Sequence, residues 1–337
     1  MGIYAWQDEV WQQLAEARAR RHHALLLRGR RGIGKLDFAL ALSKALLCER
    51  ADAQQFACDA CPSCNWFNLG NHPDYRLLTP EQESSDEDEP ASSKKTGKKT
   101  QISISQVREL GDFLELASHR SGGYRIVLIH PAEALNLASA NALLKMLEEP
   151  PPGALFILVA HQPQKLLPTI MSRCHKIDMP VPDEAQATAW LHAQGIADPG
   201  QQLAYAGGSP LAVLGGVEDA AGKLAELWKQ LSKGARMDAF ISAPLFISHG
   251  MDTAVLALQK WTYDLMACKL AGSIRYHASL QGALQALAKG VDLAMLLDYQ
   301  RKLDEARKSA NHPLNNELQL ESLLIQYTQL FLTPTKP

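Results

Sequence analysis

The segment at residues 29–36, Gly-Arg-Arg-Gly-Ile-Gly-Lys-Leu, constrains the fold of this chain more than any other part of the sequence. An apolar run at residues 24–27 precedes it, and an apolar pattern with helical spacing follows it. A strand, a glycine-rich turn and a helix in this order are typical of a phosphate-binding loop, in which backbone N–H groups and a lysine hold the phosphates. The candidate phosphate-binding residues are Gly29, Gly32, Gly34 and Lys35.

The last position of this loop does not fit an ATPase. Leu36 stands where the pattern requires Ser or Thr, whose hydroxyl group binds Mg²⁺. A leucine offers no oxygen and cannot coordinate a hard cation. Two interpretations of the remaining loop stay open, a tight strand-to-helix turn or residual phosphate binding by Lys35 without a metal. We do not expect ATP to bind at this site.

Strand and helix patterns alternate after the loop. Apolar runs at residues 126–129 and 156–160 predict two further buried strands. A Ser-x-x-Gln capping pattern predicts a helix that begins at Ser103, and a periodic apolar stripe predicts another that ends before Pro150. This alternation predicts an α/β fold with a parallel sheet and helices on both faces. Beyond about Pro180 the strand signals end and helical periods continue to the end of the chain.

The chain is expected to contain three domains. Residues 1–178 form the sheet domain, residues 179–217 a small helical domain, and residues 218–337 an all-helical domain. Two segments are inserted in the first domain, a cysteine-rich module at residues 48–64 and a charged stretch at residues 81–100. The charged stretch has no large apolar side chain to bury, so we expect a disordered surface loop.

Composition limits the classes of function. No apolar run approaches the roughly 20 residues that cross a bilayer, and the first residues lack the pattern of a secretory leader, so we expect a cytoplasmic protein. The net charge of −2 gives no sign of the basic face with which a protein grips DNA by itself.

Four of the six cysteines indicate a metal site. Cys48, Cys58, Cys61 and Cys64 include a Cys-x-x-Cys-x-x-Cys pattern, whose spacing lets thiolates reach one tetrahedral ion at about 2.3 Å. Without an export signal, disulfides are not expected. Four sulfur ligands leave no position open for water, so the pattern favours a structural Zn²⁺ ion. An iron–sulfur cluster and free thiols are the alternatives.

Several strings together resemble the AAA+ clamp-loader family. They are the loop and the cysteine module, with His72-Pro73-Asp74, residues 138–151 (Ala-Ser-Ala-Asn-Ala-Leu-Leu-Lys-Met-Leu-Glu-Glu-Pro-Pro) and Ser172-Arg173-Cys174. The resemblance covers about the first 215 residues, and the long string is highly specific. It implies a P-loop AAA+ domain followed by a helical lid and an all-α collar that joins subunits into a ring. It also implies that Glu148-Glu149 shapes a subunit contact.

Departures from the active family pattern imply a subunit without its own ATPase activity. Hydrolysing members end the second strand with Asp-Glu, whereas this chain has His130-Pro131. They also carry an arginine after a Gly-Ser-x turn, where this chain has Leu211. With Leu36, three catalytic positions are missing. The resemblance therefore implies a stator-like subunit of the bacterial DNA polymerase III clamp loader, part of a DNA-directed DNA polymerase holoenzyme at the replisome.

The resemblance gives Arg173 a role at another chain. In this family the equivalent arginine reaches the ATP site of a neighbouring subunit and stabilises charge on the transferring phosphate. The implied partners are gamma/tau-like ATPase and delta-like subunits, with the sliding clamp and primed DNA reached through the complex. For a lone arginine, a surface ion pair is the simpler explanation. Two other functions stay open, a self-sufficient P-loop ATPase with unusual Mg²⁺ handling and a zinc-dependent nucleic-acid-binding module.

Overall fold

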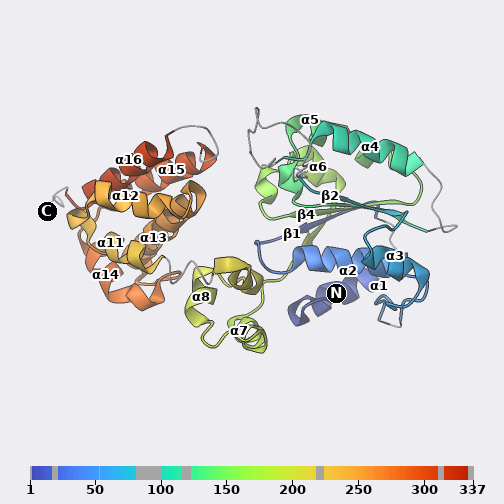
Figure 1. Cartoon of the computed structure of the whole chain (residues 1–337), viewed down its shortest axis with the longest axis horizontal. Coiled ribbons are helices and arrows are strands. Elements are labelled where there is room, and N and C mark those ends of the chain that lie inside the picture. Colours follow the sequence, from blue (N-terminus) through green and yellow to red (C-terminus); the bar gives the residue numbers. More distant parts are fainter. Residues whose placement is uncertain are drawn as a thin grey trace, which may run out of the picture. The chain divides into compact units, whose positions relative to one another are not determined.

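The structure is a computed structural model that describes residues 2–16, 22–52, 54–80, 101–115, 123–217, 224–309 and 315–332. The chain divides into two compact units, Met1–Pro182 and Asp183–Pro337. The first unit contains a sheet with helices, and the described part of the second is helical (Figure 1). The charged residues 81–100 lie outside the described residues, so their expected disorder stays a prediction.

Five parallel strands form the sheet, in the order β2-β3-β4-β1-β5. The strands are β1 (Ala24–Arg28), β2 (Tyr75–Leu78), β3 (Arg125–Ile129), β4 (Ala154–Ala160) and β5 (His175–Asp178). The three inner strands are those that the sequence predicts, because each is a nearly continuous buried apolar run. The sequence pattern does not predict the edge strands β2 and β5, because most of their side chains are exposed or only partly buried and several are polar.

Helices cover both faces of the sheet, which confirms the predicted fold class (Figure 1). One face carries α1 (Asp8–Glu16), α2 (Lys35–Leu47) and α3 (Pro62–Asn68), and the other carries α4 (Ile104–Glu115), α5 (Leu137–Glu148) and α6 (Pro168–Arg173). Successive strand residues point to opposite faces. In β1, Leu25 and Leu27 therefore pack with the first group of helices, and Leu26 packs with the second. Short 3-10 turns lie at Ala5–Gln7, Ala132–Ala134 and Pro163–Lys165.

Local sequence signals predict where α4 begins and where α5 ends. At the start of α4, the Ser103 backbone N–H donates to Gln106 Oε1 (2.9 Å), and the Gln106 backbone N–H donates to Ser103 Oγ (3.4 Å). This reciprocal pair is the predicted capping pattern. Helix α5 ends at Glu148, before Pro150, as predicted.

The second unit is a bundle of helices with two hydrophobic clusters. Its elements are α7 (Glu184–Ala193), α8 (Gly200–Tyr205), α9 (Pro210–Ala212), the π-helix η5 (Val213–Val217), α11 (Ala225–Leu231), η6 (Gly234–Arg236), α12 (Ala239–Ile247), α13 (Met251–Ala271), η7 (Ala278–Leu280), α14 (Gln281–Lys289), α15 (Leu293–Ser309) and α16 (Asn316–Gln329). A small cluster joins Ala187, Leu191, Leu203 and Val213, and a larger one joins α11 to α16. The predicted lid and collar division of this unit stays a prediction. No helix in the described ranges has both the length and the apolar character to span a membrane.

Candidate functional site

The glycine-rich loop joins β1 to α2, and the N-terminal segment packs against it. Gly34 has a φ of +85°, a region that residues with a Cβ rarely adopt. A Cβ at this position would overlap the ring of Tyr4. Gln7 Nε2 donates to the carbonyl oxygens of Ile33 and Gly34, both at 3.0 Å, and the Tyr4 hydroxyl donates to Asp37 Oδ2 at 2.9 Å. The loop conformation is thus held by residues that precede the sheet.

The side chain of Lys35 makes its hydrogen bonds within the loop. Lys35 is 2% exposed, and its Nζ donates to the Gly29 carbonyl oxygen at 2.7 Å and to that of Arg30. Burial lowers the pKa of Lys35 to about 8. Leu36 is partly buried and packs against the apolar cluster beneath α2. The side chain at the last position of the loop is therefore a partly buried hydrocarbon packed against the core.

Two imidazoles lie where the neighbouring strands β3 and β4 end, at the carboxyl ends of the parallel strands. His130 follows β3 and His161 follows β4, and their Nε2 atoms are 3.2 Å apart. Burial, and secondarily the charge of Lys35, lowers the pKa of both, that of His161 to about 3. Both rings are therefore neutral at physiological pH, and neither offers a carboxylate to Mg²⁺.

The carboxylate of Glu133, close to His161, accepts hydrogen bonds from the backbone. Glu133 accepts hydrogen bonds from the backbone N–H groups of His161 (3.0 Å) and Gln162 (3.1 Å). Sequence reasoning notes His130 but misses His161 and Glu133. His161 directly follows a predicted strand, and the carboxyl ends of neighbouring parallel strands meet at one edge, so this signal was present in the sequence.

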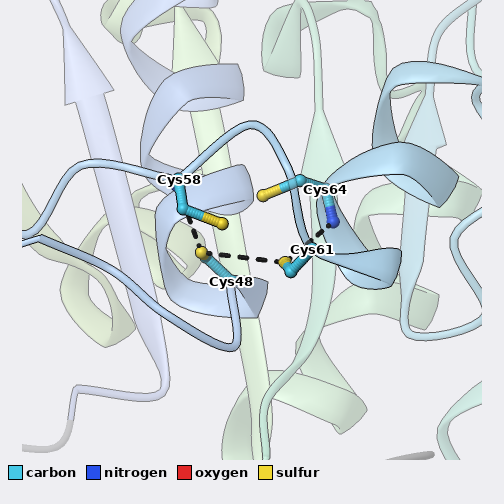
Figure 2. A group of neighbouring side chains, drawn as sticks. All are labelled: Cys48, Cys58, Cys61 and Cys64. Carbon is cyan, nitrogen blue, oxygen red and sulfur yellow. Dashed lines mark hydrogen bonds between the residues drawn. The ribbon is translucent and has the colours of Figure 1, made fainter.

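The four cysteines lie together, as predicted. Cys48 ends α2, Cys58 and Cys61 lie in the following loop, and Cys64 is in the first turn of α3 (Figure 2). Their sulfur atoms all lie within 4.8 Å of one another, and those of Cys48 and Cys61 are 3.9 Å apart. Four sulfurs at about 2.3 Å from a tetrahedral ion would be separated by about 3.8 Å, so the donor set fits Zn²⁺.

Backbone N–H groups support thiolates in this cluster. Cys48 Sγ accepts from the N–H groups of Arg50 and Cys58, both at 3.3 Å, and Cys61 Sγ accepts from that of Cys64 at 3.4 Å. The pKa of Cys58 is lowered to about 6, mainly by a hydrogen bond from the backbone of Ala60. Such bonds stabilise the charged form, which is the form that binds metals, whereas burial opposes it and raises the pKa of Cys48 and of Cys64.

The His72-Pro73-Asp74 string connects the cysteine module to the sheet. His72 is 4% exposed, and its Nδ1 accepts from the Asp74 backbone N–H at 3.0 Å. Ser63 Oγ donates to the Leu47 carbonyl oxygen at 2.7 Å, so it accepts the Nε2–H of His72 at 2.9 Å. One imidazole therefore joins α3, the end of α2 and the entrance to β2.

Arg173 is the last residue of α6, and Cys174 separates it from β5. Its Nη1 donates to the Thr169 carbonyl oxygen at 3.0 Å, and its Nη2 is 2.6 Å from Glu148 Oε1 at the end of α5. The side chain is 35% exposed. The sequence singled out Arg173 but treated Glu148 only as part of a structural string. The following Cys174 is buried, and burial raises its pKa to about 11. It is not among the four clustered thiols.

Comparisons with known proteins agree on one family. Residues 6–183 match the family model described as DNA polymerase III, delta subunit. DNA polymerase III subunit delta' of Pseudomonas aeruginosa is 34% identical over 97% of this chain and 98% of its own length. The subunit of the same name from Yersinia pestis is 39% identical over 58% of this chain and 53% of its own length.

A solved structure of a DNA polymerase III gamma subunit-related protein from Thermotoga maritima aligns with 96% of this chain and 99% of its own, with a TM-score of 0.45 and 19% identity. The family-model match covers more than half of this chain, and the Pseudomonas relative matches nearly all of it. The chain therefore belongs to the family of bacterial DNA polymerase III delta' subunits.

Proposed function

We propose that this chain is an ATPase-inactive, stator-like subunit of a DNA polymerase III clamp loader. It joins gamma/tau-like ATPase subunits and a delta-like subunit in a ring that loads a sliding clamp onto primed DNA in the cytoplasm. The single observation that carries the proposal is an asymmetry between two sites. The chain's own phosphate loop lacks the groups for hydrolysis, whereas Arg173 is partly exposed at the end of a helix.

Three features argue against hydrolysis by this chain. Leu36 has a hydrocarbon side chain that packs against the apolar cluster, so this position offers no oxygen to Mg²⁺. Lys35 donates to carbonyl groups of its own loop. His130 and His161 stand as a neutral pair at the edge where an Asp-Glu pair would bind the metal and orient water. Nucleotide binding at this loop is accordingly not part of the proposed function.

The four-cysteine cluster is proposed to hold a structural Zn²⁺ ion. Cys48, Cys58, Cys61 and Cys64 would complete a tetrahedral coordination shell, so the ion would have no position open for a substrate or a water molecule. Its contribution would be to stabilise the loop between α2 and α3.

The proposed domain roles follow the family. Residues 1–178 would be the AAA+ domain, residues 179–217 the lid, and residues 218–337 the collar that joins the ring. Neither of the two rival functions is favoured by the site. A self-sufficient ATPase predicts phosphate release by the purified chain, and a nucleic-acid-binding module predicts strongly salt-dependent DNA affinity of the chain alone.

The test is Arg173→Ala in a clamp loader reconstituted with its ATPase subunits, the clamp and primed DNA. Loss of an arginine of this kind lowers the rate at the site it serves by a factor on the order of 10³–10⁵. The total rate of ATP hydrolysis by the complex should therefore fall by at least the fraction that one ATPase site contributes, while the complex still assembles. Arg108→Ala, at an exposed arginine of α4, is the matched control. Unchanged hydrolysis by the Arg173→Ala complex would refute the proposal.

A further inference from the structure

The ends of α5 and α6 are joined by one ion pair. Glu148 is the last residue of α5 and Arg173 the last residue of α6, and Arg173 Nη2 lies 2.6 Å from Glu148 Oε1. Both side chains are partly exposed, at 35% for Arg173 and 49% for Glu148. The pair therefore lies at the surface of the N-terminal unit, where another molecule can reach it.

The contacts fix the guanidinium group from two sides. Nη2 faces the carboxylate of Glu148 on α5, and Nη1 donates to the Thr169 carbonyl oxygen on α6, with Ser172 Oγ at 3.5 Å. A guanidinium group has five N–H donors in a rigid plane. These contacts use the two terminal nitrogens only in part. Within the described residues, Nε of Arg173 has no hydrogen-bond acceptor, so donors remain for an acceptor from outside the chain.

Helix stability does not explain a carboxylate at this position. The C-terminal end of a helix carries partial negative charge, so an acidic side chain there is unfavourable by itself. Glu148 occupies the last position of α5, only three residues after Lys145, the basic residue in the same turn. The ion pair with Arg173 offsets this unfavourable interaction with the helix end. The contact with Arg173, and not the stability of α5, therefore explains the carboxylate at this position.

Restricting an arginine matters for its action on a phosphate. A free arginine side chain samples many rotamers, and only a few of them direct its planar donors at one acceptor. Two fixed contacts limit this freedom before a partner arrives, so less conformational entropy is lost when the phosphate is bound.

We infer that Glu148 is the positioning residue of Arg173, holding its guanidinium plane in the orientation in which the remaining donors meet the terminal phosphate of ATP on a neighbouring subunit. This inference rests on the proposed function, because it assigns a role to Glu148 only through Arg173.

The test compares Glu148→Ala, Glu148→Gln and Glu109→Gln in the reconstituted complex. Glu109 is the matched control, because it is an exposed acid of α4 with no ion pair among the described residues. An exposed ion pair of this kind corresponds to about a two- to fivefold effect. Glu148→Ala should lower kcat by that factor at the served site and leave KM for ATP unchanged. Glu148→Gln, which keeps a neutral acceptor, should restore part of the rate, and Glu109→Gln should behave as the wild type.

The double variant Glu148→Ala with Arg173→Ala separates positioning from structure. If Glu148 acts through Arg173, the double variant should match Arg173→Ala alone. A further loss in the double variant would overturn the inference, because it would show a structural role. A Glu148→Ala complex as fast as or faster than the wild type would also overturn it, since the carboxylate would then compete with the phosphate. These results differ from failure of the proposed function, in which Arg173→Ala itself has no effect.

Discussion

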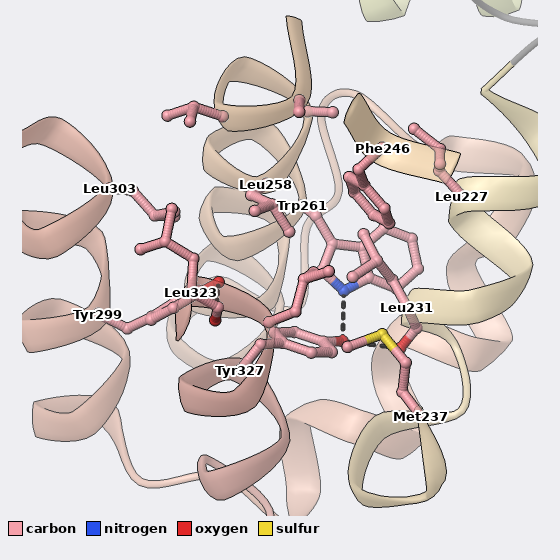
Figure 3. Close-up of a cluster of buried hydrophobic side chains, with 14 of the residues drawn as sticks. Leu227, Leu231, Met237, Phe246, Leu258, Trp261, Tyr299, Leu303, Leu323 and Tyr327 are labelled. Carbon is pink, nitrogen blue, oxygen red and sulfur yellow. Dashed lines mark hydrogen bonds between the residues drawn. The ribbon is translucent and has the colours of Figure 1, made fainter. Parts of the chain in front are cut away.

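Replacing Tyr327 by phenylalanine removes a single oxygen atom from the core of the C-terminal unit (Figure 3). The Tyr327 hydroxyl is fully buried, accepts from Trp261 Nε1 at 2.8 Å and donates to the Leu231 carbonyl oxygen at 2.7 Å. Burial raises the pKa of Tyr327 far above its ordinary value, so the hydroxyl always keeps the proton that it donates. Leu231 ends α11, and the last carbonyl groups of a helix have no partner within the helix.

The Tyr327→Phe variant would leave two buried groups without partners, the Trp261 N–H and the Leu231 carbonyl. Each such group costs about 1–3 kcal/mol, and partial relaxation of the helix end recovers some of it, so we expect the free energy of unfolding to fall by about 2–4 kcal/mol. For a domain of this size, about 2–4 °C in Tm per kcal/mol corresponds to a fall of roughly 4–16 °C.

Two other tyrosines of the same unit give a graded control. Tyr299 is also buried, but its hydroxyl donates to the Leu323 carbonyl oxygen at 3.1 Å, within α16, where a helical partner remains. Tyr263 is 41% exposed. Urea unfolding and calorimetry of the full chain should therefore rank the losses as Tyr327→Phe, then Tyr299→Phe, then Tyr263→Phe near zero. A loss for Tyr299→Phe equal to that of Tyr327→Phe would refute the reasoning from unpaired groups.

Three further outcomes follow from the first unit. Leu36→Thr should give no ATP turnover in a phosphate-release assay, because His130 and His161 still replace the carboxylates; measurable turnover would contradict this. The pKa of Lys35 in the folded chain is lowered from 10.5 to about 8, so between these pH values the unfolded chain holds a proton that the folded chain has lost. Relative to Lys35→Met, the free energy of unfolding in urea should therefore rise as the pH increases from about 8 to 10.5. A difference that does not change with pH would contradict the burial argument. A strong chelator should remove one Zn²⁺ per chain and abolish amide-exchange protection at residues 48–64 while the sheet stays protected; chains isolated without zinc would argue against the metal assignment.

The sequence predicted the features that depend on neighbouring residues. The inner strands, the glycine-rich turn between β1 and α2 and the capped start of α4 each arise from patterns within a few positions of one another. The four cysteines likewise gather at one point because their spacing brings them there across a short loop. The edge strands β2 and β5 lack such a local pattern, since an exposed strand needs no continuous apolar run.

The sequence by itself therefore determined that a glycine-rich loop ending in Lys35-Leu36 precedes a four-cysteine module and, later, Arg173. Only the folded structure decided which distant groups meet. His130 faces His161, Glu148 pairs with Arg173, and Tyr327 closes the end of a helix 96 residues away in sequence. The physical reason is that local propensities depend on adjacent residues. Contacts between remote side chains depend on how strands and helices pack, and no spacing along the chain specifies that packing.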